Sequence, residues 1–73
     1  MMVKGKVKRV MREKGFGFIT AEDGREIFFH QSGVEGTSFE ALRAGQRVSF
    51  DVEQGQKGPR AVHVQLAETV VSR

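Results

Sequence analysis

The sequence has no cysteine, tryptophan or tyrosine, one proline and two histidines in 73 residues. Without cysteine there is no disulfide framework, and two histidines with these neighbours are too few for a zinc site. No run approaches the roughly 20 apolar residues of a membrane-spanning helix, and the residues after Met1 lead into no signal-peptide core. We therefore expect a cytoplasmic protein that holds no metal and no cofactor and does not enter a membrane.

The length leaves room for one domain with one small core, because chains of this size bury only about 60% of their unfolded surface. We expect that domain to cover residues 1–67 and a short C-terminal tail to follow at residues 68–73. There is no internal repeat and no long segment with the 3.6-residue period of an amphipathic helix.

Positive charge is concentrated near the start of the chain, although the net charge is only +3. Between residues 22 and 53 the balance reverses, with seven acidic residues against three arginines. Before residue 15 a single acid, Glu13, faces six basic residues, which are Lys4, Lys6, Lys8, Arg9, Arg12 and Lys14. Such a strip attracts polyanions. Scattered basic residues also keep small proteins soluble, so the strip alone does not identify a ligand.

Phenylalanine follows immediately after this strip. In a strand, Phe16 and Phe18 share one face, whereas Gly15, Gly17 and Ile19 take the other. A buried strand would favour a branched residue at position 17, so we interpret the glycines as leaving the backbone open to a ligand.

A second segment repeats this separation, with Phe28 and His30 on one face and Ile27 and Phe29 on the other. The Asp-Gly turn at residues 22–25 predicts a hairpin that brings like faces together. A single phenylalanine is more often a core residue, but here the alternation separates the rings from the aliphatic side chains. We expect one exposed cluster formed by Phe16, Phe18, Phe28 and His30.

The remaining pattern predicts five short strands. The first covers about residues 3–11, with a bend near residues 8–9. The second follows a turn at residues 12–15 and ends near residue 20. The other three cover about residues 26–30, 47–53 and 61–66, and the last of them begins after Pro59. On that last strand Val62, Val64 and Leu66 should share one face. Residues 38–43 predict one helical turn, in which Phe39 is either a core anchor or a further exposed ring. We expect an all-β fold, a small antiparallel sheet closed into a five-stranded barrel.

The spacing of the rings indicates a ligand. Phe16 and Phe18 should have Cβ atoms about 6.6 Å apart at ~3.3 Å per residue, whereas stacked bases are ~3.4 Å apart. The rings therefore suit splayed bases of a single strand, each stacking with ~1–3 kcal/mol and little base preference. The candidate nucleic-acid-binding residues are Lys8, Arg9, Lys14, Phe16, Phe18, Phe28, His30, Phe39, Lys57 and Arg60.

From Val3 to Leu66 the chain resembles the cold-shock domain family, small OB-fold proteins that bind single-stranded RNA and DNA. Residues 14–19 resemble the family's first ribonucleoprotein motif, and residues 27–30 resemble the second. The resemblance implies a monomeric, non-enzymatic RNA chaperone of low specificity, which keeps transcripts unpaired and thereby affects translation or transcription termination.

Three positions depart from the family pattern. The family usually has Trp then Phe where this chain has Arg9 and Val10, and many members have Phe where it has Gln31. Losing the stacking rings at positions 9 and 31 should weaken binding. The Arg9 guanidinium can itself stack on a base and offset part of this loss. We predict that Phe29 fills the space left by Val10.

Two other functions compete with nucleic-acid binding. An exposed aromatic face can instead dock a partner protein. An enzyme is a weaker alternative, because His30 and Ser32 have no evident orienting acid and the sequence has no metal-ligand cluster.

Overall fold

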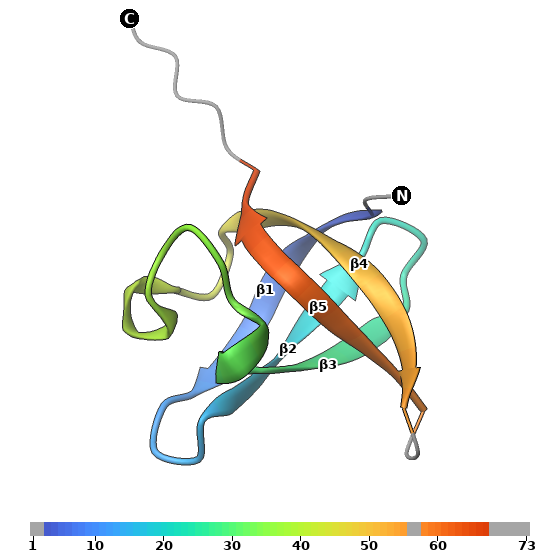
Figure 1. Ribbon diagram of the computed structural model, residues 1–73. Coiled ribbons are helices and arrows are strands. Elements are labelled where there is room, and N and C mark those ends of the chain that lie inside the picture. The colour runs from blue at the N-terminus through green and yellow to red at the C-terminus, as the bar shows by residue number, and fades with distance from the viewer. Residues whose placement is uncertain (1–2, 56–57, 68–73) are drawn as a thin grey trace, which may run out of the picture.

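The computed structural model describes residues 3–55 and 58–67 as one closed barrel of five strands (Figure 1). This confirms the predicted all-β fold. The elements are β1 (Val3–Met11), β2 (Phe16–Ala21), β3 (Glu26–His30), the 3-10 helices η1 (Gln31–Gly33) and η2 (Phe39–Ala41), β4 (Arg47–Gly55) and β5 (Gly58–Leu66). The predicted tail at residues 68–73 lies outside the described residues.

The strands follow the order β1-β2-β3-β5-β4 around the barrel. Four neighbouring pairs are antiparallel, and β3 pairs with β5 in parallel. The sheet is therefore not antiparallel throughout. In a closed ring of five strands the two directions cannot alternate at every step, so closure itself requires one parallel pair.

The core occupies the inside of the barrel, where alternate residues of the strands meet. Ile19, Ile27 and Phe29 are fully buried, as the alternation predicts. The buried apolar set among the described residues is Val7, Ile19, Ala21, Ile27, Phe29, Phe39, Leu42, Val48, Phe50, Ala61 and Val64.

The predicted bend in the first strand is present as a change of register. Val7 lies opposite Ile19, but Arg9 already lies opposite Phe18, so Lys8 is an extra residue on β1. The bulge moves Val10 to the inner face three residues after Val7, where it packs against the core.

The last strand differs from its prediction at both ends. It begins at Gly58 and includes Pro59, which pairs with Gln54 near the end of the β4–β5 hairpin. Its inner face is also different, because Ala61 and Val64 are buried whereas Leu66 is 45% exposed.

A second bulge explains this difference. His63 has a φ of +54°, and the register between β4 and β5 shifts at the same place. The extra residue interrupts the two-residue alternation of side chains. The prediction assumed an unbroken alternation along the whole strand, and it therefore placed Leu66 on the inner face.

Candidate nucleic-acid interface

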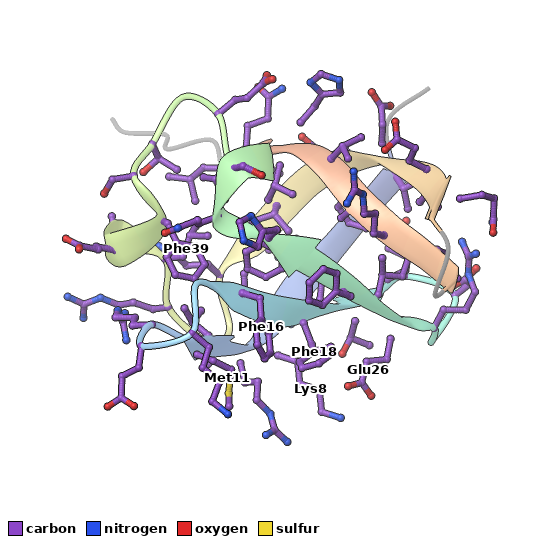
Figure 2. All side chains as sticks on the ribbon, turned by 60° about the horizontal axis from the view of Figure 1, so that its bottom comes forward. Lys8, Met11, Phe16, Phe18, Glu26 and Phe39 are labelled. Carbon is purple, nitrogen blue, oxygen red and sulfur yellow. The ribbon has the colours of Figure 1, made fainter. Side chains whose placement is uncertain are left out.

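Strands β2 and β3 hold the rings of Phe16, Phe18 and Phe28 on the outer side of the barrel, where all three are half-buried. Ring centroids are 5.9 Å apart for Phe16 and Phe18, 5.5 Å for Phe16 and Phe28, and 6.1 Å for Phe18 and Phe28. Figure 2 shows Phe16 and Phe18 pointing away from the barrel. We call these three rings and the exposed His30 the aromatic face.

The pairing of four strands aligns a row across this face. Phe18 lies opposite Phe28, Arg9 lies opposite Phe18, and Arg60 lies opposite Phe28. Directly opposed residues share a face of the sheet, so the two central rings have a guanidinium at each end. The order Arg9, Phe18, Phe28, Arg60 therefore combines stacking surfaces with charges that can contact phosphate.

A second row contains a residue that the sequence analysis missed. Met11 lies opposite Phe16, which in turn lies opposite His30, and Figure 2 shows Met11 on the same side as the two labelled rings. A methionine sulfur packs favourably against aromatic rings. The feature that could have revealed Met11 is the bulge at Lys8, because it shifts the alternation of β1 so that Met11 faces outward.

His30 is oriented by a local turn. Its Nδ1 accepts the backbone N–H of Ser32 at 3.1 Å and lies 2.9 Å from the Ser32 hydroxyl oxygen. Because a backbone N–H can only donate, Nδ1 is the acceptor and the neutral ring carries its proton on Nε2. The pairing of His30 with Ser32 thus caps η1.

Two of the predicted cations, Lys8 and Arg60, each lie beside a glutamate. Lys8 Nζ lies 3.2 Å from a Glu26 carboxylate oxygen, and Arg60 Nη2 lies 3.3 Å from one of Glu53. All four side chains are about half exposed, so these ion pairs are weak and can exchange a carboxylate for a phosphate.

Two other basic residues near the start of the chain, Lys14 and Arg12, have different roles. Lys14 is exposed in the turn between β1 and β2. Arg12 is structural, because its Nη2 donates to the Leu42 carbonyl at 2.7 Å and ties β1 to the segment after η2. Lys57, also predicted to bind, lies outside the described residues.

The placement of Phe39 among the binding residues requires correction. Its side chain is only 8% exposed, and its ring packs edge-to-face against Phe29 with centroids 6.0 Å apart. Figure 2 shows it on the other side of the sheet from Phe16 and Phe18. Helix η2 directs this ring into the core, so Phe39 is the core anchor and has no part in the aromatic face.

The role of Gly17 also differs from the predicted one, which was to leave the backbone open to a ligand. A Cβ atom there would lie 2.6 Å from the Arg9 carbonyl oxygen and 2.8 Å from the Phe29 ring. The glycine therefore makes room for the core, not for a ligand. Val10, Gly17 and Phe29 are consecutive partners across β1, β2 and β3, an arrangement that supports the predicted replacement of ring volume at Val10 by Phe29.

A hollow of about 650 Å³ extends the aromatic face beyond Phe28. Its lining includes Arg60 and the hairpin residues Gly55, Gly58 and Pro59. The hairpin therefore provides a wall beside the Phe28 ring, where a further base or sugar can lie.

Within residues 3–55 and 58–67, no helix is long and apolar enough to cross a membrane. The same residues contain no group of three or more acidic, histidine or cysteine side chains arranged to hold a metal ion.

Comparison with known proteins agrees with this site. The family model of the 'cold-shock' DNA-binding domain matches residues 3–67. The chain is 49% identical over 63 residues to the major cold shock protein of Streptococcus pyogenes, covering 86% of this chain and 94% of that protein. It is 50% identical over 66 residues to cold shock protein CspC of Bacillus subtilis, covering 90% of this chain and 100% of that protein.

The solved structure of Drosophila Unr CSD456 matches the barrel with a TM-score of 0.78 at 22% identity, covering 100% of this chain and 29% of that one. At this identity the match shows the OB-fold alone. The family match over the whole barrel and the similar relatives lead to one conclusion: the chain is a nucleic-acid-binding protein of the 'cold-shock' DNA-binding domain family.

Proposed function

We propose that the protein binds single-stranded RNA or DNA with low sequence specificity and acts as an RNA chaperone. In this proposal it works as a monomer in the cytoplasm and keeps transcripts unpaired, with effects on translation or transcription termination. The observation that carries the proposal is the spacing of the outward-facing rings of Phe16, Phe18 and Phe28, which is 5.5–6.1 Å.

That spacing selects against an intact duplex. Bases within one strand of a duplex are ~3.4 Å apart, so neighbouring rings on the face cannot each stack on neighbouring bases of that strand. A single strand can splay its bases and place one on each ring. Every base has a π-face, so stacking contributes ~1–3 kcal/mol per base with little sequence preference.

Strand opening follows from this selectivity. The protein binds the unpaired state of a hairpin better than the paired state, so it shifts the equilibrium toward open strands by the difference in binding free energy. The chemistry needed is stacking and phosphate contact, which the row from Arg9 to Arg60 provides.

The test is a fluorescence titration with oligothymidine at low salt, alongside the same titration with a blunt duplex of equal length. We expect tight binding to the single strand, weak binding to the duplex, and opening of a fluorophore-quencher hairpin at saturating protein. If about four phosphates are contacted, log K should fall with log salt at a slope near −3.

Absence of binding to oligothymidine at low salt would contradict the proposal. It would favour the alternative, a module that docks a partner protein on the aromatic face, where the half-buried Met11 adds apolar surface beside Phe16.

A further inference from the structure

A second cationic surface lies at the other end of β1. A hollow of about 350 Å³ opens there over Gly5, between the start of β1, the end of β2 and the start of β4. Lys4, Lys6 and Arg47 line it, together with the exposed Thr20. We call these four residues and the space they surround the cationic hollow.

The three cations are held close together by strand pairing. Lys6 lies directly opposite Arg47 on β4 and opposite Thr20 on β2. Lys4 is two residues from Lys6 and therefore on the same face. Opposed like charges destabilise a sheet, so this surface gains stability when an anion lies between them.

These cations have no direct carboxylate partner within the described part of the chain. None of the three forms a side-chain hydrogen bond or ion pair there, whereas Lys8 and Arg60 each have a glutamate partner. Glu22 is the acidic residue on the described rim of the hollow, which leaves an excess of positive charge.

Gly5 lines the hollow at the point where β1 packs closely against β2. A Cβ atom on Gly5 would lie 2.5 Å from the Thr20 carbonyl oxygen, so the chain approaches its neighbour too closely for any residue but glycine. The glycine is explained by this close packing, and the room for a ligand group is the hollow itself, which Lys6 and Arg47 line. The Thr20 hydroxyl, on the same outer face, is a further donor for an anion.

The hollow is continuous with the aromatic face. Thr20 follows Phe18 by two residues on the outer side of β2, a distance of about 6.6 Å along the strand. In Figure 1 the start of β1 and the arrowhead of β2 lie at the same end of the barrel, and the turn between these strands lies at the opposite end. A strand that leaves the ring of Phe18 in this direction meets Thr20 next, with Lys6 opposite it on β1 and Glu26, already paired with Lys8, opposite it on β3.

We propose that the cationic hollow binds the phosphodiester backbone of the same single strand, beyond the bases that stack on the aromatic face. This inference rests on the proposed function and extends it, because it predicts a binding track along β1 and β2 that is longer than the rings. It also predicts a polarity: only one end of a short oligonucleotide can reach the hollow.

The experiment separates phosphate contact from stacking. Hexathymidine would be compared with the same oligonucleotide carrying a tail of about four abasic phosphodiester units at its 5′ end or at its 3′ end. We expect tighter binding with the tail at one end only. If the tail makes about three phosphate contacts at ~0.7 per contact, it should add about 2 to the salt slope. Its benefit would then fall about 18-fold between about 50 and 200 mM salt.

Two controls test the assignment to these residues. The same tail with neutral methylphosphonate links should give no benefit. In the variant Lys6→Gln/Arg47→Gln the benefit should fall only about threefold over that salt range, because about one contact remains. The variant Arg25→Gln/Arg43→Gln loses the same formal charge outside the hollow and should keep the full benefit of the tail.

The outcomes distinguish the inference from the function on which it rests. If hexathymidine itself fails to bind, the proposed function is wrong. If it binds but the tail gives equal benefit at both ends, or the benefit and its salt dependence are unchanged in Lys6→Gln/Arg47→Gln, the attraction is diffuse and the hollow is not a binding site.

Discussion

Phe28 and Phe29 are neighbours in the sequence but lie in opposite environments. Phe28 is half-buried at the centre of the row between Arg9 and Arg60, whereas Phe29 is fully buried. We expect Phe28→Ala to lower oligothymidine affinity by ~1–3 kcal/mol, since one stacking ring is lost. Its urea unfolding curve should change little. Fluorescence titration and equilibrium unfolding measure the two effects.

Phe29→Ala is the matched control at the adjacent position. Removing a fully buried phenyl ring should cost ~3–5 kcal/mol in the free energy of unfolding. If Phe28→Ala were the variant that unfolds, the two faces of β3 would be assigned the wrong way round and the binding surface would have to be abandoned.

Arg9 is exposed opposite Phe18, at one end of the row of rings. We expect Arg9→Trp to tighten oligothymidine binding, because an indole adds a stacking surface of ~1–3 kcal/mol where the guanidinium offers a smaller one. The titration should be made at high salt, where loss of the Arg9 charge matters least. Unchanged or weaker affinity there would show that position 9 does not contact a base.

At the scale of the elements, the contact of β2 with its two neighbours depends on the absence of a side chain at Gly17. A Cβ there would lie 2.6 Å from the Arg9 carbonyl oxygen and 2.8 Å from the Phe29 ring. We expect Gly17→Ala to cost ~1–3 kcal/mol in the free energy of unfolding, as overpacked cores do, measured by urea denaturation.

Gly33→Ala is the comparison for this effect. A Cβ at Gly33 would meet the Ala61 carbonyl oxygen at 3.4 Å, an ordinary van der Waals distance, and its φ is not positive. Its unfolding curve should stay close to that of the original protein. Equal destabilisation by the two substitutions would mean that close packing at Gly17 is not the cause.

The bulge on β5 carries an ion pair that ties the strand to the segment after η1. His63 Nδ1 lies 2.6 Å from a Glu35 carboxylate oxygen, and the backbone N–H of Glu35 donates to the Val64 carbonyl at 2.8 Å. The hydrogen bond to Glu35, and then its charge, raise the pKa of His63 above its ordinary value of 6.5, and the charges of Asp51 and Glu53 add to the effect.

The sign of the pH dependence follows from this direction. A raised pKa means that the folded state binds the proton more tightly than the unfolded state. The stabilisation is therefore fully present below pH 6.5 and is lost as the pH rises through the pKa of the folded state. We expect His63→Asn to be less stable than the original protein under acidic conditions and to approach it under alkaline ones.

Urea unfolding at a series of pH values measures this difference, and asparagine is chosen because it tolerates a positive φ better than most residues. Glu35→Gln should remove the same part of the pH dependence. Parallel stability curves for the original protein and both variants would show that the ion pair contributes nothing.

Across the whole molecule, acidic residues restrain the cations beside the aromatic face. Glu26 pairs with Lys8, and Glu53 pairs with Arg60. We expect Glu26→Gln to tighten oligothymidine binding by about two- to fivefold, because Lys8 then meets phosphate without first leaving a carboxylate.

Glu40→Gln removes one negative charge far along the chain, from an exposed residue of η2, and serves as the control for net charge. It should change the affinity less. Equal effects from Glu26→Gln and Glu40→Gln would show that the overall field, and not the local pair, controls binding.

The arrangement of the aromatic face could be predicted from the residues themselves. In a regular strand the side-chain period is two, so the order of residues in 16–19 and 27–30 already separates Phe16, Phe18 and Phe28 from the aliphatic side chains. The Asp-Gly turn is equally local, since its geometry depends on Gly24, which has a φ of +93°.

Other features depended on contacts between distant parts of the chain. Phe39 could point either way until η2 was placed against Phe29, and Leu66 lost its expected burial because a bulge exists only relative to a partner strand. The carboxylate partners of Lys8 and Arg60 likewise arise from strand pairing.

The sequence by itself thus determined the local periodicity, the turns and the two sides of each regular strand, because these follow from backbone geometry over a few residues. The tertiary structure alone decided how the barrel closes, which ring enters the core and which cations remain without an acidic partner among the described residues. Those features are set by distances between residues that only folding brings together.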